Sequence, residues 1–143
     1  MKSIWGLFFF CVGCSSTPLA SPDVILISVD TLRADRVTEA LMPSLTSLKQ
    51  KGTHFSKAYS PANESLFAHT SIFTGHKASK WGQLSYESFR LPDSAITLAS
   101  TFSRAGYRTQ AVVGGGHLSP VFGLDSGFDK YATGSHFAGF AQT

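Results

Sequence analysis

The sequence predicts an α/β fold, in which helices flank a mostly parallel β-sheet. The apolar run "DVILISV" at residues 23–29 is typical of a strand that is buried on both faces. A second β-branched run lies at residues 107–113, and segments with helical spacing separate the two runs. Parallel strands that helices separate are joined by crossover connections, which are typical of α/β proteins.

Length and composition limit the chain to one globular domain. It has 143 residues, of which 43% are apolar and 15% are charged, so it can bury one modest core. The formal net charge is +3, but the Lys and Arg residues are scattered and form no basic block or stripe. We therefore expect no nucleic-acid partner.

The N-terminal segment "MKSIWGLFFFCVGC" (residues 1–14) has the pattern of a secretory signal. One Lys precedes an apolar stretch that is too short to span a bilayer, and small residues follow before Cys14. The ending "CVGC" resembles a bacterial lipobox, in which the cysteine is lipidated, although Cys11 stands where that pattern usually has Leu. A signal segment without lipidation is the alternative. Residues 15–22 are rich in Ser, Thr and Pro and form a predicted tether.

These features predict a protein of the bacterial cell envelope, held on its periplasmic or surface face by a lipid anchor to the membrane. Secretion is the alternative location. Both cysteines fall inside the signal segment, so the remaining domain, residues 23–143, has no cysteine for a disulfide or a thiolate metal site.

After the first strand, the spacing predicts a helix over residues 41–52. Pro43 lies near its first turn and Gly52 stands where a helix commonly ends. Residues 53–60 alternate loosely and predict a short strand or an extended link. The role of this helix is structural, because it presents one apolar face made of Leu41, Leu45 and Leu48.

Two further helices are predicted, over residues 65–74 and 93–106. The loop between them, residues 75–92, has no clear period. Asp93 or Ser94 can cap the start of the later helix, which ends at a glycine.

The last predicted strand, residues 107–113, leads into a Gly-rich and aromatic loop region at 114–134 with one helical turn. His117 follows three consecutive glycines in this loop. Glycines let backbone N–H groups approach an oxyanion, and the imidazole adds a donor. A tight turn that carries a surface histidine is the alternative interpretation.

Asp30 and Thr31 come directly after the first predicted strand, at the edge where α/β sheets bind ligands. The Asp30 carboxylate is a hard oxygen ligand suited to Mg²⁺ or Ca²⁺, with the Thr31 hydroxyl beside it. One aspartate cannot make a metal site by itself. Capping of the following turn is an equally good explanation of these two residues.

Ser65 stands where a polar loop becomes the second helix. A nucleophile at a helix N-terminus gains from the partial positive charge there, which stabilises an alkoxide and attracts an anionic substrate. His69 lies one turn later on the same face and could contact the same anion or serve as an acid or base. Alternatively Ser65 is only an N-cap, a role for which Asn63 and Glu64 are also suited.

Five segments in this order resemble the N-terminal part of sulfatases in the alkaline phosphatase superfamily. That resemblance implies an alkaline-phosphatase/sulfatase-like mixed sheet flanked by helices, of which the chain covers the N-terminal portion only. The segments are "PDVILISVDTLRADR" (22–36), "MPSLTSLKQKG" (42–52), "AYSPANESLFAHTSIFTG" (58–75), "LASTFSRAGYRT" (98–109) and "GHLSPVFGLDSGFDKY" (116–131).

The resemblance also assigns roles to the candidate residues. It implies that Asp30 binds a divalent metal, with Ca²⁺ or Mg²⁺ as the first candidates and Zn²⁺ as a third; Thr31 stands where a second aspartate is common. Ser65 takes the position of the nucleophile, which family members convert to formylglycine. Phe67 and His69 replace the proline and arginine of the conversion signal. His117 is implied to contact the substrate, one residue out of register.

Sulfatases of this family are longer, and the remaining metal ligands come from a downstream "DHG"-like segment that these 143 residues do not show. We therefore expect a truncated or split copy that is inactive and poorly soluble alone. The predicted function is metal-dependent hydrolysis of a sulfuric ester. The alternatives are a phosphoric ester hydrolase or phosphotransferase that uses unmodified Ser65, and a non-catalytic surface lipoprotein.

Overall fold

The computed structural model of the protein describes residues 22–134. The chain divides into two compact units, Met1–Thr31 and Leu32–Thr143. The predicted signal segment with Cys14 lies outside the described residues. Within 22–134, no helix is both long and apolar enough to cross a bilayer.

The predicted strand at residues 23–29 is not formed. In the structure this segment runs without regular hydrogen bonding to a neighbouring strand. Its apolar side chains are exposed, and Ile25 is the extreme case at 81%. The prediction failed because an apolar run shows only that a segment favours burial. A strand also needs a partner that supplies backbone hydrogen bonds.

The predicted helix at 41–52 is confirmed as α1 (Pro43–Lys51), which Gly52 ends in an extended conformation. Its apolar face, however, is not fully buried: Leu45 is half-buried, and Leu48 is 62% exposed. Residues 53–60 form an extended link with one turn, and the alternative of a strand is wrong.

The predicted helix at 65–74 is confirmed as α2 (Ser65–Thr74), and the core of the second unit is built around it. Hydroxyl groups on this helix donate back to carbonyls one turn earlier, as Thr70 does to Leu66 at 2.8 Å. Such bonds let polar side chains lie in an apolar setting. The side chains of the core cluster are Leu66, Phe67, Ala78, Phe89, Leu91, Ala95 and Leu124.

Helix α3 (Leu98–Arg104) is shorter than the predicted segment and begins with a different cap. Thr97 accepts a hydrogen bond from the Ser100 amide, and the Ser100 side chain accepts one from the Thr97 amide. The assignment of the cap to Asp93 or Ser94 is therefore wrong, because a capping box that begins at Thr97 satisfies the first amides of the helix.

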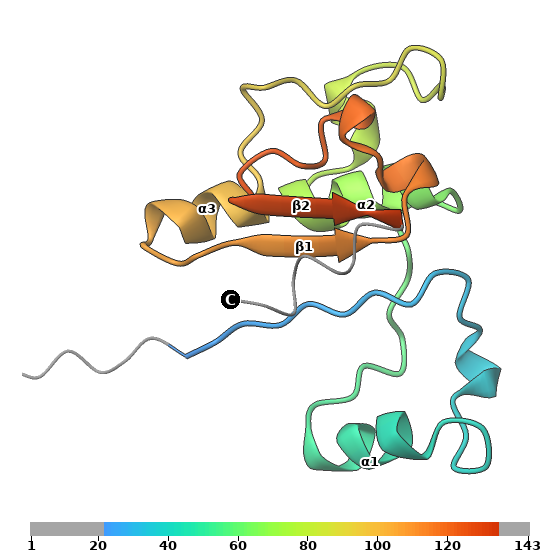
Figure 1. Cartoon of the computed structure of the whole chain (residues 1–143). Coiled ribbons are helices and arrows are strands. Elements are labelled where there is room, and N and C mark those ends of the chain that lie inside the picture. The colour runs from blue at the N-terminus through green and yellow to red at the C-terminus, as the bar shows by residue number, and fades with distance from the viewer. Residues whose placement is uncertain (1–21, 135–143) are drawn as a thin grey trace, which may run out of the picture. The chain divides into compact units, whose positions relative to one another are not determined.

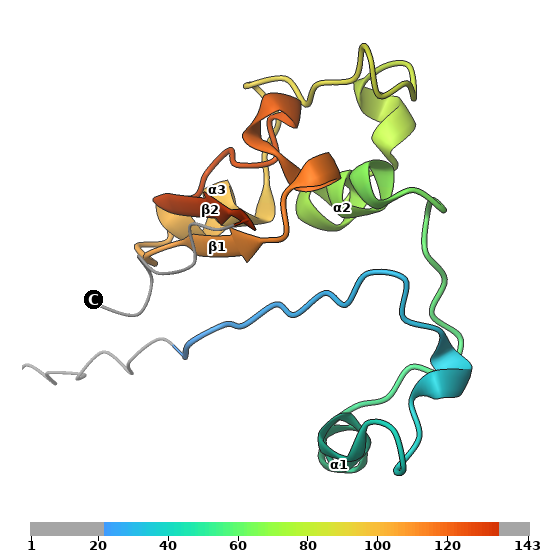
Figure 2. The same cartoon turned by 45° about the vertical axis from the view of Figure 1, so that its right-hand side comes forward.

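Strands β1 (Gln110–Val113) and β2 (Lys130–Thr133) pair in parallel, with Gln110 opposite Lys130 and Val113 opposite Thr133. Figure 1 shows the pair side by side, with α2 and α3 behind it, and Figure 2 shows the same helices from another angle. Strand β1 confirms the prediction. Strand β2 lies inside the predicted loop 114–134, so that part of the prediction is wrong: four residues are too few to show an alternating pattern.

The turn before β2 is tied to the residue before β1. The Thr109 amide donates to the Asp129 carboxylate at 2.7 Å, and its hydroxyl donates to the Gly127 carbonyl at 2.8 Å. In return the Asp129 amide donates to the Thr109 hydroxyl at 3.0 Å. These bonds set the register of the parallel pair at its start.

Tyr131 of β2 bonds to the segment that connects β1 to β2. Its hydroxyl donates to the Leu118 carbonyl at 2.7 Å. Burial, and after it the negative charge of Asp125, raises the pKa of Tyr131 to about 12, so the hydroxyl keeps its proton and remains a donor at neutral pH.

Gly127 is the point of closest approach between this turn and α3, and alanine should not fit there. A Cβ at Gly127 would lie 2.2 Å from the Ser100 amide nitrogen, and its φ is +88°. We expect Gly127→Ala to lower the free energy of unfolding by about 3 kcal/mol, from backbone strain and steric overlap together.

Gly106 provides the matched control, with φ of +87° and no atom within 4 Å of an added Cβ. Gly106→Ala should cost only the strain, about 1 kcal/mol. Urea unfolding of both variants measures the difference, and equal losses would show that the approach of Gly127 to Ser100 is unimportant.

Candidate active site

The start of α2 places Ser65 at the first helical position. Glu64, with extended φ and ψ of −110° and 135°, is the N-cap residue, and no side chain caps the helix. The interpretation of Ser65 as the N-cap is therefore wrong by one residue. The first hydrogen bond of the helix runs from the Ala68 amide to the Glu64 carbonyl at 2.9 Å. The amides of residues 65–67 lie before this ladder, at the positive end of the helix dipole.

His69 is fixed against the same turn. Its Nδ1 lies 2.7 Å from the Ser65 carbonyl oxygen, and the residue is only 7% exposed. Because a carbonyl only accepts hydrogen bonds, Nδ1 is the donor, and a neutral ring then carries its lone pair on Nε2. The predicted pairing of Ser65 and His69 on one helical turn is thus present. The catalytic role of His69 stays a prediction.

His117 is connected to the same end of α2 through aromatic rings. It lies in the 3₁₀ turn Gly116–Leu118, which packs against α2. Its imidazole stacks on Tyr86 with centroids 4.2 Å apart, and Tyr86 stacks on Phe67 at 5.5 Å. Phe67 belongs to the first turn of α2, so three segments far apart in sequence meet here. We call Phe67, Tyr86 and His117 the aromatic stack.

Tyr86 is the residue that sequence reasoning missed at this site. It lies in the loop without a clear period, where only its aromatic character could have drawn attention. Burial first, and then a hydrogen bond and the negative charge of Glu64, raise the pKa of the Tyr86 hydroxyl. Tyr86 is therefore linked to the N-cap residue of α2 as well as to its first turn.

Asp30 and Thr31 belong to the other unit and end its described part. Thr31 has a φ of 56°, the one positive φ outside glycine in residues 22–134. A β-branched residue adopts this conformation at a cost of about 1–2 kcal/mol, and such strain is often found at functional positions.

The described residues do not form a complete metal centre. Nowhere in residues 22–134 do three His, Cys, Asp or Glu side chains gather at a potential metal site. Mg²⁺ and Ca²⁺ require at least six oxygen ligands, and Asp30 with Thr31 supplies too few of them. A divalent cation held at Asp30 would supply Lewis-acid charge.

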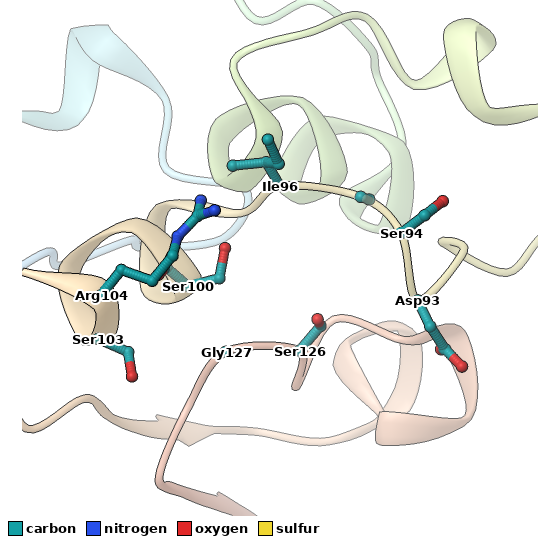
Figure 3. A pocket seen from close by; sticks show the side chains of 9 residues that line it. Asp93, Ser94, Ile96, Ser100, Ser103, Arg104, Ser126 and Gly127 are labelled. Carbon is teal, nitrogen blue, oxygen red and sulfur yellow. The ribbon is translucent and has the colours of Figure 1, made fainter.

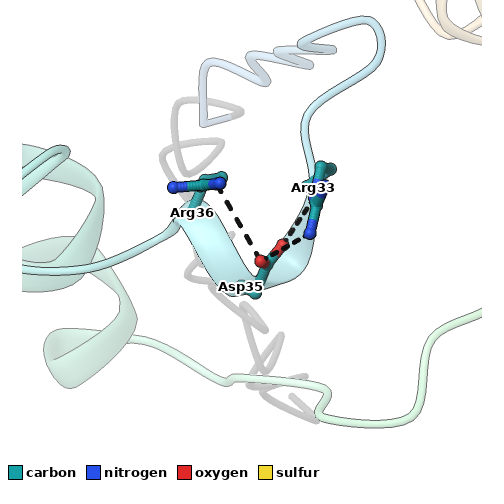
Figure 4. Close-up of polar contacts among 3 residues, drawn as sticks. All are labelled: Arg33, Asp35 and Arg36. Carbon is teal, nitrogen blue, oxygen red and sulfur yellow. Dashed lines mark hydrogen bonds and ion pairs between the residues drawn. The ribbon is translucent and has the colours of Figure 1, made fainter.

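Asp35 is the carboxylate nearest to Asp30 in sequence, and it is already paired. It lies in the 3₁₀ turn Ala34–Arg36 and accepts hydrogen bonds from Arg33 Nε at 2.9 Å and Nη2 at 2.8 Å. Arg36 Nε is 3.9 Å away (Figure 4). The bond to Asp35 raises the pKa of the Arg33 guanidinium. Asp35 is therefore a poor candidate for a second metal ligand.

An open pocket of about 330 Å³ lies elsewhere, between the start of α3 and the turn before β2 (Figure 3). None of the predicted site residues lines it. Arg104 borders it, with its Nε donating to the Ser100 carbonyl at 3.2 Å. The hydroxyl groups around it belong to Ser94, Ser100, Ser103 and Ser126.

Comparison with known proteins agrees with the order of the motifs. A family model described as sulfatase matches residues 22–140. An arylsulfatase of Clostridium perfringens (strain 13 / Type A) is 31% identical over 126 residues, which is 85% of this chain and 26% of that protein. The chain thus spans about a quarter of the length of this curated relative. No solved structure matches the chain.

Proposed function

Since the chain belongs to the sulfatase family, we propose that it serves the hydrolysis of a sulfuric ester, with Ser65 as the nucleophile. The anionic group of the ester binds at the N-terminus of α2. His69 and His117 stabilise the charge on the transferred group. The relative is an arylsulfatase by name, so an aryl sulfate is the first substrate class to consider.

The observation that carries this proposal is the position of Ser65 in the first turn of α2. Ser65 is the first of the residues 65–67 whose main-chain amides precede the hydrogen-bond ladder, so the nucleophile and the anion-binding end of the helix belong to the same turn. The bond between His69 Nδ1 and the Ser65 carbonyl fixes a second polar side chain at this turn.

The reaction is a transfer of the sulfuryl group. Ser65 Oγ attacks the sulfur, the bond between sulfur and the ester oxygen breaks, and the alcohol leaves with the proton that the hydroxyl loses. Water then hydrolyses the covalent ester, which releases sulfate and restores the Ser65 hydroxyl. If Ser65 is formylglycine instead, its hydrated aldehyde attacks and then expels sulfate.

A second candidate is the hydrolysis or transfer of a phosphoric ester by the unmodified hydroxyl. The observation in its favour is that Phe67 and His69 occupy the two positions where the resemblance places the signal for aldehyde formation. Phe67 is 3% exposed and belongs to the core, while His69 is bonded to its own helix. Neither side chain supplies the proline or the arginine of that signal, which favours a serine that stays unconverted.

An assay of the two ester classes tests the proposal. Because the chain spans a quarter of its relative, the assay uses the longest product of the gene that contains residues 1–143, with Ca²⁺, Mg²⁺ or Zn²⁺ added in turn. We expect release of 4-nitrophenol from 4-nitrophenyl sulfate to exceed that from 4-nitrophenyl phosphate. The reverse order favours the second candidate, and turnover of neither ester would contradict both. The mass of the peptide that contains Ser65 distinguishes a hydroxyl from an aldehyde, which weighs less by one H₂.

A further inference from the structure

We propose that Tyr86 is a positioning residue, which holds the His117 imidazole beside the first turn of α2 so that it can meet the anion bound there. This inference rests on the proposed function and adds a residue to it. Tyr86 does not touch the reacting atoms; it acts through the aromatic stack.

The geometry of the aromatic stack supports this role. The rings of Tyr86 and His117 are close to parallel, at 19° and 4.2 Å, and those of Tyr86 and Phe67 are at 24° and 5.5 Å. Tyr86 is thus the middle ring, with a buried anchor on one side and an imidazole on the other. Phe67 is only 3% exposed, so the inner end of the stack lies in the core.

Without Tyr86, little would orient the imidazole. His117 is an exposed residue in a 3₁₀ turn of three residues, and no side chain caps that turn. An exposed side chain samples several rotamers, and ordering it on a ligand costs about 0.5–1.5 kcal/mol. A ring stacked on one face has already lost that freedom.

Glu64 adds an electrostatic connection between Tyr86 and the start of α2. Burial first, and then a hydrogen bond and the negative charge of Glu64, the N-cap residue of α2, raise the pKa of Tyr86. The ring contact with Phe67 and the charge of Glu64 thus both connect Tyr86 to the helical turn that carries Ser65.

The test is a sulfate titration of the full chain by NMR, in which the His117 ring protons and the backbone amides of residues 65–67 are followed. Tyr86→Leu removes the middle ring, whereas Tyr86→Phe keeps it and removes only the hydroxyl. Phe89→Leu is the matched control: Phe89 also contacts Phe67 in the core, and within the described residues no ring contact joins it to His117.

We expect Tyr86→Leu to abolish the ring-current shift of the His117 protons and to weaken sulfate binding about three- to tenfold. Tyr86→Phe should preserve the ring-current shift, and Phe89→Leu should preserve both the shift and the affinity. An unchanged shift in Tyr86→Leu, or an equal loss of affinity in Phe89→Leu, would overturn the positioning role. If the wild-type chain bound no sulfate, the proposed function would fail, while the shift would still decide whether Tyr86 orients the imidazole.

Discussion

Replacing Ser65 by alanine in the longest product of the gene that contains residues 1–143 is expected to lower kcat for aryl ester hydrolysis by at least about 10³-fold, because no other hydroxyl takes its place as the attacking group. Alanine is a good helix former, and Ser65 is not the capping residue of α2, so the helix should remain intact. The amides that precede the hydrogen-bond ladder remain too. The substitution should therefore remove the reaction while sparing the binding of sulfate.

Ser60→Ala is the matched control for this prediction. Ser60 lies in the exposed loop before α2, and its hydroxyl bonds to the Ala62 carbonyl at 2.5 Å. We expect its kcat to stay within about twofold of the wild type, since such surface changes are usually small. A similar kcat for Ser65→Ala and the wild type would show that another group attacks the ester.

Removing the ring of Phe67 is expected to cause the largest loss of stability among the site residues. Phe67 is 3% exposed and contacts both Tyr86 and Phe89. Phe67→Ala should lower the free energy of unfolding by about 3–5 kcal/mol, because it leaves a cavity at the centre of the core. Urea unfolding measures this loss.

The resemblance implies a proline at position 67, which Phe67→Pro would restore. Comparing this variant with Phe67→Ala separates the effect of losing the ring from the effect of a proline in the backbone. Residue 67 lies in the first turn of α2, where the amide has no partner within the helix, so proline removes no helical hydrogen bond there. We expect Phe67→Pro to be within about 1 kcal/mol of Phe67→Ala, since the missing ring dominates both losses.

Ile72→Ala is the control for both substitutions, because Ile72 lies on the same helix but is 43% exposed. It should cost less than about 1 kcal/mol. If Phe67→Pro were as stable as the wild type, Phe67 would not hold α2 in the core.

Local signals explain why the sequence could predict α2 and the place of Ser65. The segment 65–74 is apolar, follows a polar loop and stops at Gly75, which takes a left-handed conformation with φ of 68°. Each of these signals acts within one or two turns of chain. The one-residue error at the cap arose because Glu64 and Ser65 are both compatible with the start of a helix.

Features that depend on distant partners could not be predicted in this way. The apolar run at 23–29 predicted a strand, but the structure shows no ladder for it. Strand β2 has too few residues for a visible period, and its pairing with β1 depends on bonds between Thr109 and the turn at 127–129. Family membership implies a portion of an alkaline-phosphatase-like fold, of which the described residues show helices and one parallel pair.

The aromatic stack is the clearest case of a site feature without a sequence signal. Phe67, Tyr86 and His117 come from a helix, a loop and a 3₁₀ turn, and the spacings between them have no period. The sequence draws attention to His117 because it follows three glycines, and to Phe67 because it departs from a motif. Tyr86, which joins them, became visible only in three dimensions.

The most direct measurement of the central claim is the NMR titration of the wild-type chain with sulfate. If the start of α2 binds the anionic group, the amides of residues 65–67 and the ring protons of His117 will shift together and saturate at one dissociation constant. Shifts confined to the pocket beside Arg104, or no saturable shift at all, would contradict the placement of the anion site at Ser65.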